Sequence, residues 1–193
     1  MIKSLYPAFQ RWSAGGSVYI ISDTHFDDED CTLMDRCWMT PQCHIKVINT
    51  WVCKNDTLIH LGDVGNPEYL KKVKGYKVLI TGNHDKGASV YEPYFDEIYT
   101  GPLFIGDRIL LSHEPIYGLD WCVNIHGHNH NAELPEDDTH INLAANVVNF
   151  RLFSLGEAIK NGMLSDVNGI HRETVDNAKQ HSMFGGKNNG SAT

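Results

Sequence analysis

The sequence predicts an α/β fold with mixed β-sheets, and two features of the chain lead to this prediction. Short apolar runs that end in a polar residue recur along the chain, and in its first half helical segments separate them. From residue 98 onward the apolar runs are broken by turn residues, which is typical of antiparallel hairpins. With 193 residues, 41% of them apolar, the chain is long enough for one well-buried domain.

Five apolar runs are predicted to be buried strands, because such continuous runs are typical of strands covered on both faces. They cover residues 18–22, 58–61, 77–81, 109–112 and 122–126. Each run ends just before a residue that can bind a metal ion, and these residues are Asp23, Asp63, Asn83, His113 and His128. Two further strands are expected at residues 141–144 and 147–152.

Three helices are predicted from their start signals. Thr40 and Pro41 resemble an N-cap followed by proline at the first helical position, and Ile45, Ile48, Trp51 and Val52 then share one face, which gives a helix over 41–53. Asn66-Pro67 opens a shorter helix that ends before Gly75. Ser154 and Glu157 have the spacing of a capping box, for a helix that ends near Gly162. Hairpin turns are expected at Gly101-Pro102 and Gly106-Asp107.

These elements divide the chain into three parts. Residues 1–17 form an N-terminal extension, residues 18–162 the domain, and residues 163–193 a polar tail. The tail contains one weak helix pattern at 172–180, and the linker-like composition of residues 185–193 predicts a disordered end.

The charge balance of 16 Lys and Arg against 24 Asp and Glu gives a formal net charge of -8. This argues against broad binding to nucleic acid or to an anionic membrane surface. No secretory or membrane-spanning apolar run is present. The five cysteines are odd in number and form no CxxC pair, which favours reduced thiols. We therefore expect a cytoplasmic protein.

The polar residues after the strands form a set that points to metal chemistry. Each motif alone could be a loop-capping Asp or a hydrogen-bonded histidine, but together they supply seven candidate ligands: Asp23, His25, Asp63, Asn83, His113, His128 and His130. Ligands at the carboxyl ends of neighbouring strands converge on one sheet edge. Their mixed N/O chemistry suits Mn, Fe, Zn, Co or Ni. Seven ligands suffice for two divalent ions if one carboxylate bridges them, and such a pair remains net positive, which favours a phosphate substrate.

The order and wording of these motifs over residues 18–152 resemble the calcineurin-like metallophosphoesterase superfamily, especially its small bacterial and phage-type members. The resemblance implies a four-layer α/β/β/α sandwich. It also implies that Asp23, His25 and His130 bind the first metal, that Asn83, His113 and His128 bind the second, and that Asp63 bridges them. His84 would face the substrate and protonate the leaving oxygen or stabilise the transition state, with Asp85 orienting it.

The function expected from the resemblance is hydrolysis of a phosphomonoester or phosphodiester by metal-bridging hydroxide, on a small nucleotide-like substrate. We expect manganese as the metal, with Fe, Zn, Ni and Co as alternatives. A non-catalytic scaffold of the same fold that binds a protein partner is the alternative function, although such scaffolds usually lose ligands and here all are present. Metallo-β-lactamase-like chemistry requires a HxHxDH cluster that the chain lacks.

Residues near the motifs suggest a preference among substrates. Arg36, in the loop after His25, is a candidate phosphate clamp. Acidic clusters follow both His25 and His130: Asp27, Asp28, Glu29 and Asp30, then Glu133, Glu136, Asp137 and Asp138. They are solvated loops or, alternatively, repel long polyanions, so that duplex nucleic acid is a poor substrate. His60 and His126 lie within apolar runs as ligand-orienting or core histidines. The oligomeric state stays open.

Overall fold

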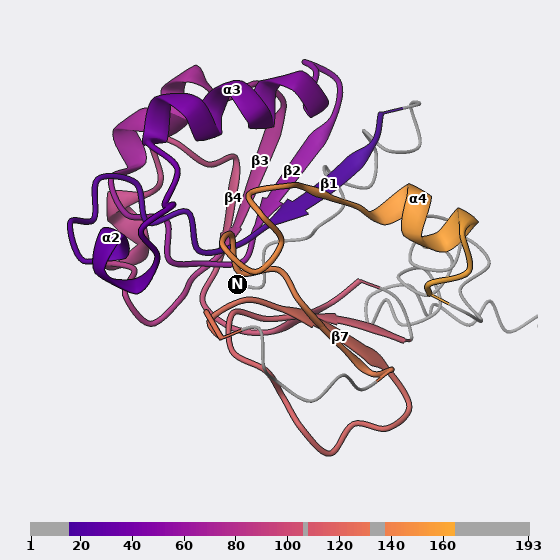
Figure 1. The fold of residues 1–193 in the computed structure, drawn as a ribbon. Coiled ribbons are helices and arrows are strands. Elements are labelled where there is room, and N and C mark those ends of the chain that lie inside the picture. The colour runs from indigo at the N-terminus through magenta and orange to yellow at the C-terminus, as the bar shows by residue number, and fades with distance from the viewer. Residues whose placement is uncertain (1–15, 106–107, 132–137, 165–193) are drawn as a thin grey trace, which may run out of the picture.

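The computed structural model describes residues 16–105, 108–131 and 138–164 (Figure 1). Most of the N-terminal extension, the helix predicted at 172–180, the end at 185–193, and Glu133, Glu136 and Asp137 lie outside these ranges. In the described part, no helix has the length and apolar character needed to cross a membrane.

The first sheet contains five strands in the order β4-β3-β2-β1-β9. These are β1 (Val18–Ile21), β2 (Thr57–His60), β3 (Tyr76–Ile80), β4 (Glu97–Tyr99) and β9 (Phe153–Ser154). Strands β1 to β4 are parallel, and β9 pairs antiparallel with β1. The carboxyl ends of β1, β2 and β3 therefore lie at the same edge of the sheet, as predicted.

The second sheet has the order β5-β6-β7-β8. Its strands are β5 (Leu103–Phe104), β6 (Ile109–Leu111), β7 (Val123–His126) and β8 (His140–Asn142). β5 pairs antiparallel with β6, whereas β6, β7 and β8 are parallel. Both sheets are therefore mixed, and the predicted α/β class with two mixed sheets is confirmed.

The helices follow the predicted start signals. α3 (Pro41–Trp51) begins with proline in its first turn, and α4 (Leu155–Lys160) is capped by the Ser154 side chain, which accepts a hydrogen bond from the Glu157 amide. The segment after Asn66 is a 3-10 helix, η1 (Pro67–Lys72), and two short elements, α2 (Cys31–Met34) and η2 (Ala88–Val90), complete the set. Figure 1 shows α3 lying across one face of the first sheet, with the second sheet beyond the other face.

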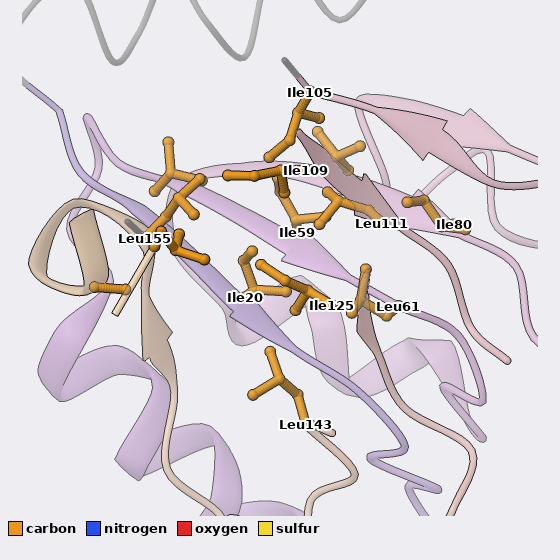
Figure 2. Close-up of a cluster of buried hydrophobic side chains, with 14 residues drawn as sticks. Ile20, Ile59, Leu61, Ile80, Ile105, Ile109, Leu111, Ile125, Leu143 and Leu155 are labelled. Carbon is orange, nitrogen blue, oxygen red and sulfur yellow. The ribbon is translucent and has the colours of Figure 1, made fainter. Parts of the chain in front are cut away.

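Two apolar cores explain why the strands are apolar on both faces. One joins the two sheets and includes Ile20, Ile59, Leu111 and Ile125, whose side chains meet in Figure 2. The other joins the first sheet to α3 and η1 and includes Ile48. Because both faces are covered, the strands of the first sheet are held firmly enough to fix the loops at their ends. The fourth layer of the expected sandwich stays a prediction.

Three predicted details are wrong. Gly101-Pro102 is not a hairpin, because β4 and β5 belong to different sheets, so this turn carries the chain from one sheet to the other. Residues 147–150 form turns and residues 151–152 belong to no regular element, so the predicted strand at 147–152 is absent, and Asn149 and Phe150 lie in the left-handed region at φ 52° and 56°. Trp51 is 40% exposed although Ile45 and Ile48 on its predicted face are buried. Apolar character alone does not distinguish these positions.

His44 on α3 is fully buried between the rings of Phe26 and Phe150, and neither of its nitrogens has a hydrogen-bond partner. Burial lowers the pKa of His44 to about 3, from an ordinary value of 6.5. The unfolded chain therefore binds a proton that the folded chain rejects, and the free energy of unfolding falls as pH drops below 6.5.

For His44 alone, we expect a loss of about 2 kcal/mol between pH 7.5 and pH 5.0. His44→Leu should remove this component while the other histidines titrate equally in both proteins. Urea unfolding of the wild type and the variant at the two pH values measures the difference. A variant that loses as much stability as the wild type would contradict the prediction.

Candidate metal centre

The loops at the carboxyl ends of β1 and β2 are tied to each other by backbone hydrogen bonds. The Asp23 amide donates to the Gly62 carbonyl and the His25 amide to the Asp63 carbonyl, each at 3.0 Å. Gly62 has φ 97°, and a Cβ there would lie 2.4 Å from the Gly82 nitrogen, so only glycine permits this approach. The strand ends thus bring the loops into contact.

Four of the predicted ligands have left-handed backbone conformations, which are uncommon for residues other than glycine. They are Asp23, His25, Asp63 and His128, with φ of 54°, 39°, 55° and 68°. Such conformations cost free energy and gather at functional sites. Their concentration here makes this edge of the sheets the candidate functional site.

The first group of candidate ligands contains Asp23, His25 and His130. The Asp23 Oδ1 atom lies 3.9 Å from His25 Nε2 and 3.6 Å from His130 Nε2. Asp23 and His25 are buried, and the Asp23 Oδ1 and His25 Nε2 atoms have no hydrogen-bond partner. Buried polar atoms without partners are costly, and a cation between them would satisfy both.

The second group contains Asp63, Asn83, His113 and His128. His113 Nε2 lies 2.7 Å from Asn83 Oδ1, 3.3 Å from Asp63 Oδ2 and 3.2 Å from His128 Nδ1. His113 Nδ1 lies 2.8 Å from the Leu61 carbonyl, to which it donates, so the lone pair of the neutral ring is on Nε2. Lone pairs of oxygen and nitrogen therefore converge on one point, which is the arrangement that a metal cation requires.

Asp63 lies between the two groups. Its Oδ2 atom is 3.7 Å from His25 Nε2 and 3.3 Å from His113 Nε2, so it reaches a histidine of each group. Its Oδ1 atom accepts a hydrogen bond from the His84 amide at 2.9 Å. One oxygen is held by the backbone and the other is directed to both groups, so Asp63 can serve as a bridging ligand.

The electrostatics of the pocket also favour a cation. Burial raises the pKa of the Asp23 carboxyl. Burial opposes protonation of His113, but the hydrogen bond to Asp63 and the negative charges of Asp23 and Asp63 prevail and raise the pKa of His113. A field that favours an added proton at His113 Nε2 also favours a divalent cation there. The residues present therefore fit two metal ions.

Residues outside the predicted set fix the histidine rings. Asp28 Oδ2 lies 3.2 Å from His25 Nδ1, and Asn146 Oδ1 lies 2.8 Å from His130 Nδ1. Each contact places the donating N–H on Nδ1 and leaves the Nε2 lone pair for a metal ion. Asn146 also donates to the His130 carbonyl at 2.9 Å. Asn146 lies between the two strands predicted at 141–144 and 147–152, and no local pattern there indicates a role at the site.

Removal of the Asn146 side chain should therefore weaken the first metal site selectively. We expect Asn146→Ala to lower the affinity of one of the two metal ions by about 10- to 100-fold, as is usual when a ligand-orienting group is lost, and to leave the affinity of the other ion unchanged. Metal titration followed by calorimetry measures both affinities. Asn49→Ala is a matched control, because the Asn49 side chain bonds to the backbone of Lys72 and Lys74, away from the site. Equal affinities in Asn146→Ala and wild type would contradict this role.

His60 orients a loop instead of binding metal. Its Nδ1 accepts from the Gly62 amide at 3.1 Å, so its protonated Nε2 donates to the Thr24 hydroxyl at 2.9 Å. Thr24 in turn donates to the Val64 carbonyl. Burial lowers the pKa of His60 to about 4, so the ring stays neutral. The hydrogen bonds from Gly62 to His60, from His60 to Thr24 and from Thr24 to Val64 therefore keep the same donors and acceptors. This chain joins the two loops that carry Asp23 and Asp63.

His84 and Asp85 follow Asn83 directly. His84 is exposed, and its ring centroid lies 5.8 Å from that of His25, so it faces solvent beside the first group. The Asp85 carboxylate accepts from the amides of Gly82, Asp63 and Val64 and from the Tyr91 hydroxyl. In the described part of the chain, the Asp85 carboxylate thus holds backbone amides and Tyr91, whereas the sequence led us to expect that it orients His84.

Trp38 lies beside the first group, in the same loop as Arg36, the predicted phosphate clamp. The Trp38 ring lies 5.9 Å from that of His25 and 5.8 Å from that of His130. Arg36 is exposed, and no hydrogen bond or ion pair joins it to the ligand groups within the described ranges. The loop thus supplies an aromatic wall to the first group. A single Trp carries no local signal of such a role.

The chain is similar to several solved structures. A protein of unknown function, AQ665, from Aquifex aeolicus is 28% identical, with a TM-score of 0.64 over 76% of this chain and 99% of that one. A nuclease MPE from Pseudomonas putida is 19% identical, with a TM-score of 0.42 over 57% of this chain and 60% of that one. An archaeal phosphodiesterase is 20% identical, with a TM-score of 0.41 over 66% and 83%. No family model and no curated protein sequence matches the chain.

Proposed function

We propose that this protein is a dinuclear metal-dependent phosphoesterase that hydrolyses a phosphomonoester or a phosphodiester. The observation that carries the proposal is the position of Asp63 Oδ2, which lies within 3.7 Å of His25 Nε2 and 3.3 Å of His113 Nε2. A carboxylate oxygen shared by two groups of lone-pair donors is the arrangement of a two-metal site.

In this proposal, Asp23, His25 and His130 hold the first ion, Asn83, His113 and His128 hold the second, and Asp63 bridges them. Divalent ions, when bound, activate water as a nucleophile and neutralise charge on the phosphoryl oxygens. The protein's own residues fix the ligand geometry through Asp28, Asn146 and the Leu61 carbonyl. We expect manganese, with Fe, Zn, Ni or Co as alternatives.

His84 is the residue that we propose to act on the leaving group. Its side chain is exposed beside the His25 ring, and within the described ranges its ring nitrogens belong to neither group of candidate metal ligands. An imidazole in this position can donate a proton to the leaving oxygen or a hydrogen bond to the charged phosphoryl group. Asp85 would support His84 indirectly, by fixing the backbone of Gly82, Asp63 and Val64.

The proposed substrate is small. Asp27, Glu29 and Asp30 are exposed in the loop after His25, so a long polyanion would meet negative charge beside the site. Duplex nucleic acid would then be a poor substrate. We further propose the four-layer arrangement of the calcineurin-like metallophosphoesterases as the complete fold, and the cytoplasm as the compartment.

The experiment that tests the proposal is metal restoration. Protein treated with a chelator should be inactive on p-nitrophenyl phosphate and on bis-p-nitrophenyl phosphate, and Mn, Ni or Zn should restore activity with two ions bound per chain. Circular dichroism before and after chelation separates loss of metal from loss of fold. A folded protein that binds two ions and turns over neither compound would favour the alternative, a non-catalytic scaffold.

A further inference from the structure

Two separate cavities border the candidate metal centre. The first, which we call the Asn83 cavity, has a volume of about 340 Å³ and is lined by Asn83 and His113 of the second group. The other, the His84 cavity, has a volume of about 320 Å³ and is lined by His84 and by Asp28, the partner of His25. Asn83 lines the first cavity and the next residue, His84, lines the second, so the two cavities border neighbouring residues of the chain.

The size of each cavity limits what it can hold. Both volumes lie at the lower end of the range of about 300 to 1,000 Å³ that is typical of small-molecule sites. Each is therefore large enough for a ring-bearing substituent. Together they offer two separate places for substituents beside the ligand groups.

The lining of the Asn83 cavity favours an uncharged substituent. Ile80, Pro102 and Ile116 supply apolar surface, and Thr81 and Thr100 supply hydroxyl groups. Its only carboxylate is Glu114, which is exposed, and its lining includes no Lys or Arg. A second phosphate in this cavity would meet the Glu114 charge, and the lining holds no Lys or Arg to offset that charge.

The lining of the His84 cavity differs in charge. Lys86 is exposed there, and of the two carboxylates, Asp27 already accepts from Asn66 and Tyr69 while Asp28 faces His25. His84 itself is the proposed donor to a leaving oxygen. The group that occupies this cavity is therefore next to the residue that can protonate it.

We propose that the centre acts on phosphodiesters whose two substituents are both uncharged ring-bearing alcohols, as in a dinucleoside monophosphate. This rests on the proposed phosphoesterase function. The leaving alcohol occupies the His84 cavity and the retained substituent the Asn83 cavity. Water adds to phosphorus, the P–O bond on the His84 side breaks, and the leaving oxygen takes a proton, which gives an alcohol and a phosphomonoester.

The test uses three compounds that share the p-nitrophenolate leaving group: bis-p-nitrophenyl phosphate, methyl p-nitrophenyl phosphate and p-nitrophenyl phosphate. The two diesters have equal charge and differ in whether a nitrophenyl ring or a methyl group is retained; because the bis compound carries two equivalent leaving groups, kcat/KM is compared per leaving group. We expect kcat/KM for the bis compound to exceed that for the methyl compound by about tenfold or more, since a filled apolar pocket typically discriminates to this extent.

Obstruction of the Asn83 cavity should abolish this preference. Gly101 lines the cavity, and a Cβ there meets no atom within 4 Å, so Gly101→Trp can be accommodated by the backbone while its ring covers the opening. Thr100→Trp obstructs the same cavity from the adjacent position. Gly156→Trp on α4 is the matched control, because a Cβ at Gly156 also meets no atom within 4 Å and lies outside both cavities.

Each outcome is decisive. A ratio of bis to methyl kcat/KM that falls toward one in Gly101→Trp or Thr100→Trp, and persists in Gly156→Trp, supports the assignment. A wild-type ratio near one, or a ratio unchanged in both cavity variants, overturns it while the proposed phosphoesterase function stands. Absence of turnover of all three compounds by metal-loaded wild type overturns the proposed function itself.

Discussion

Asp63→Asn should reduce kcat/KM on bis-p-nitrophenyl phosphate by about a thousandfold or more. Asp63 Oδ2 is the atom directed at both ligand groups, and the substitution removes its negative charge. Loss of a bridging carboxylate weakens both metal sites at once, and metal ions contribute several kcal/mol of charge stabilisation, where about 1.4 kcal/mol corresponds to tenfold in rate. Steady-state kinetics with metal analysis of the purified variant measures both effects.

A matched control for this variant is Asp56→Asn. Asp56 is also an Asp with low exposure, but its carboxylate accepts from the amides of Ser17 and Cys53 before β2, at the opposite end of the strand from Asp63. We expect it to lower the free energy of unfolding and to keep metal content and activity. If Asp63→Asn retained two tightly held ions and wild-type kcat, the bridging assignment would be wrong.

His84→Ala should keep both metal ions and lower kcat by about a hundredfold or more, because general acid catalysis typically contributes 10²- to 10⁴-fold. The Ala variant preserves the backbone amide that donates to Asp63 Oδ1, so the bridging carboxylate stays held. Elemental analysis for two ions per chain, together with kcat, separates this result from a loss of metal.

The leaving group supplies the internal control for His84. A good leaving group such as p-nitrophenolate needs little protonation, whereas an unsubstituted phenolate needs much more, so His84→Ala should be slower by a larger factor on phenyl phosphate. Equal losses on both compounds would argue that His84 stabilises the phosphoryl charge instead. Loss of metal from His84→Ala would contradict its assignment as a non-ligand.

Much of the fold and of the candidate site could be predicted because both depend on local patterns. The strands before Asp23, Asp63 and Asn83 are continuous apolar runs, because α3 covers one face of the first sheet and the second sheet covers the other. Such runs are typical of buried strands, so these strands could be recognised from the sequence. Pairing could not be predicted to the same extent. Gly101-Pro102 resembles a hairpin turn, yet a turn signal does not tell whether the next strand stays in the same sheet.

The sequence by itself determined which residues can bind metal, since the type and order of side chains after the strands are local properties of the chain. Only the tertiary structure decided how those residues are supported. Asn146 and Trp38 reach the histidines from distant segments, and Asp85 accepts from loop amides where we had expected it to orient His84. Contacts between residues far apart in the chain depend on how the two sheets and their loops pack, and no local pattern encodes that packing.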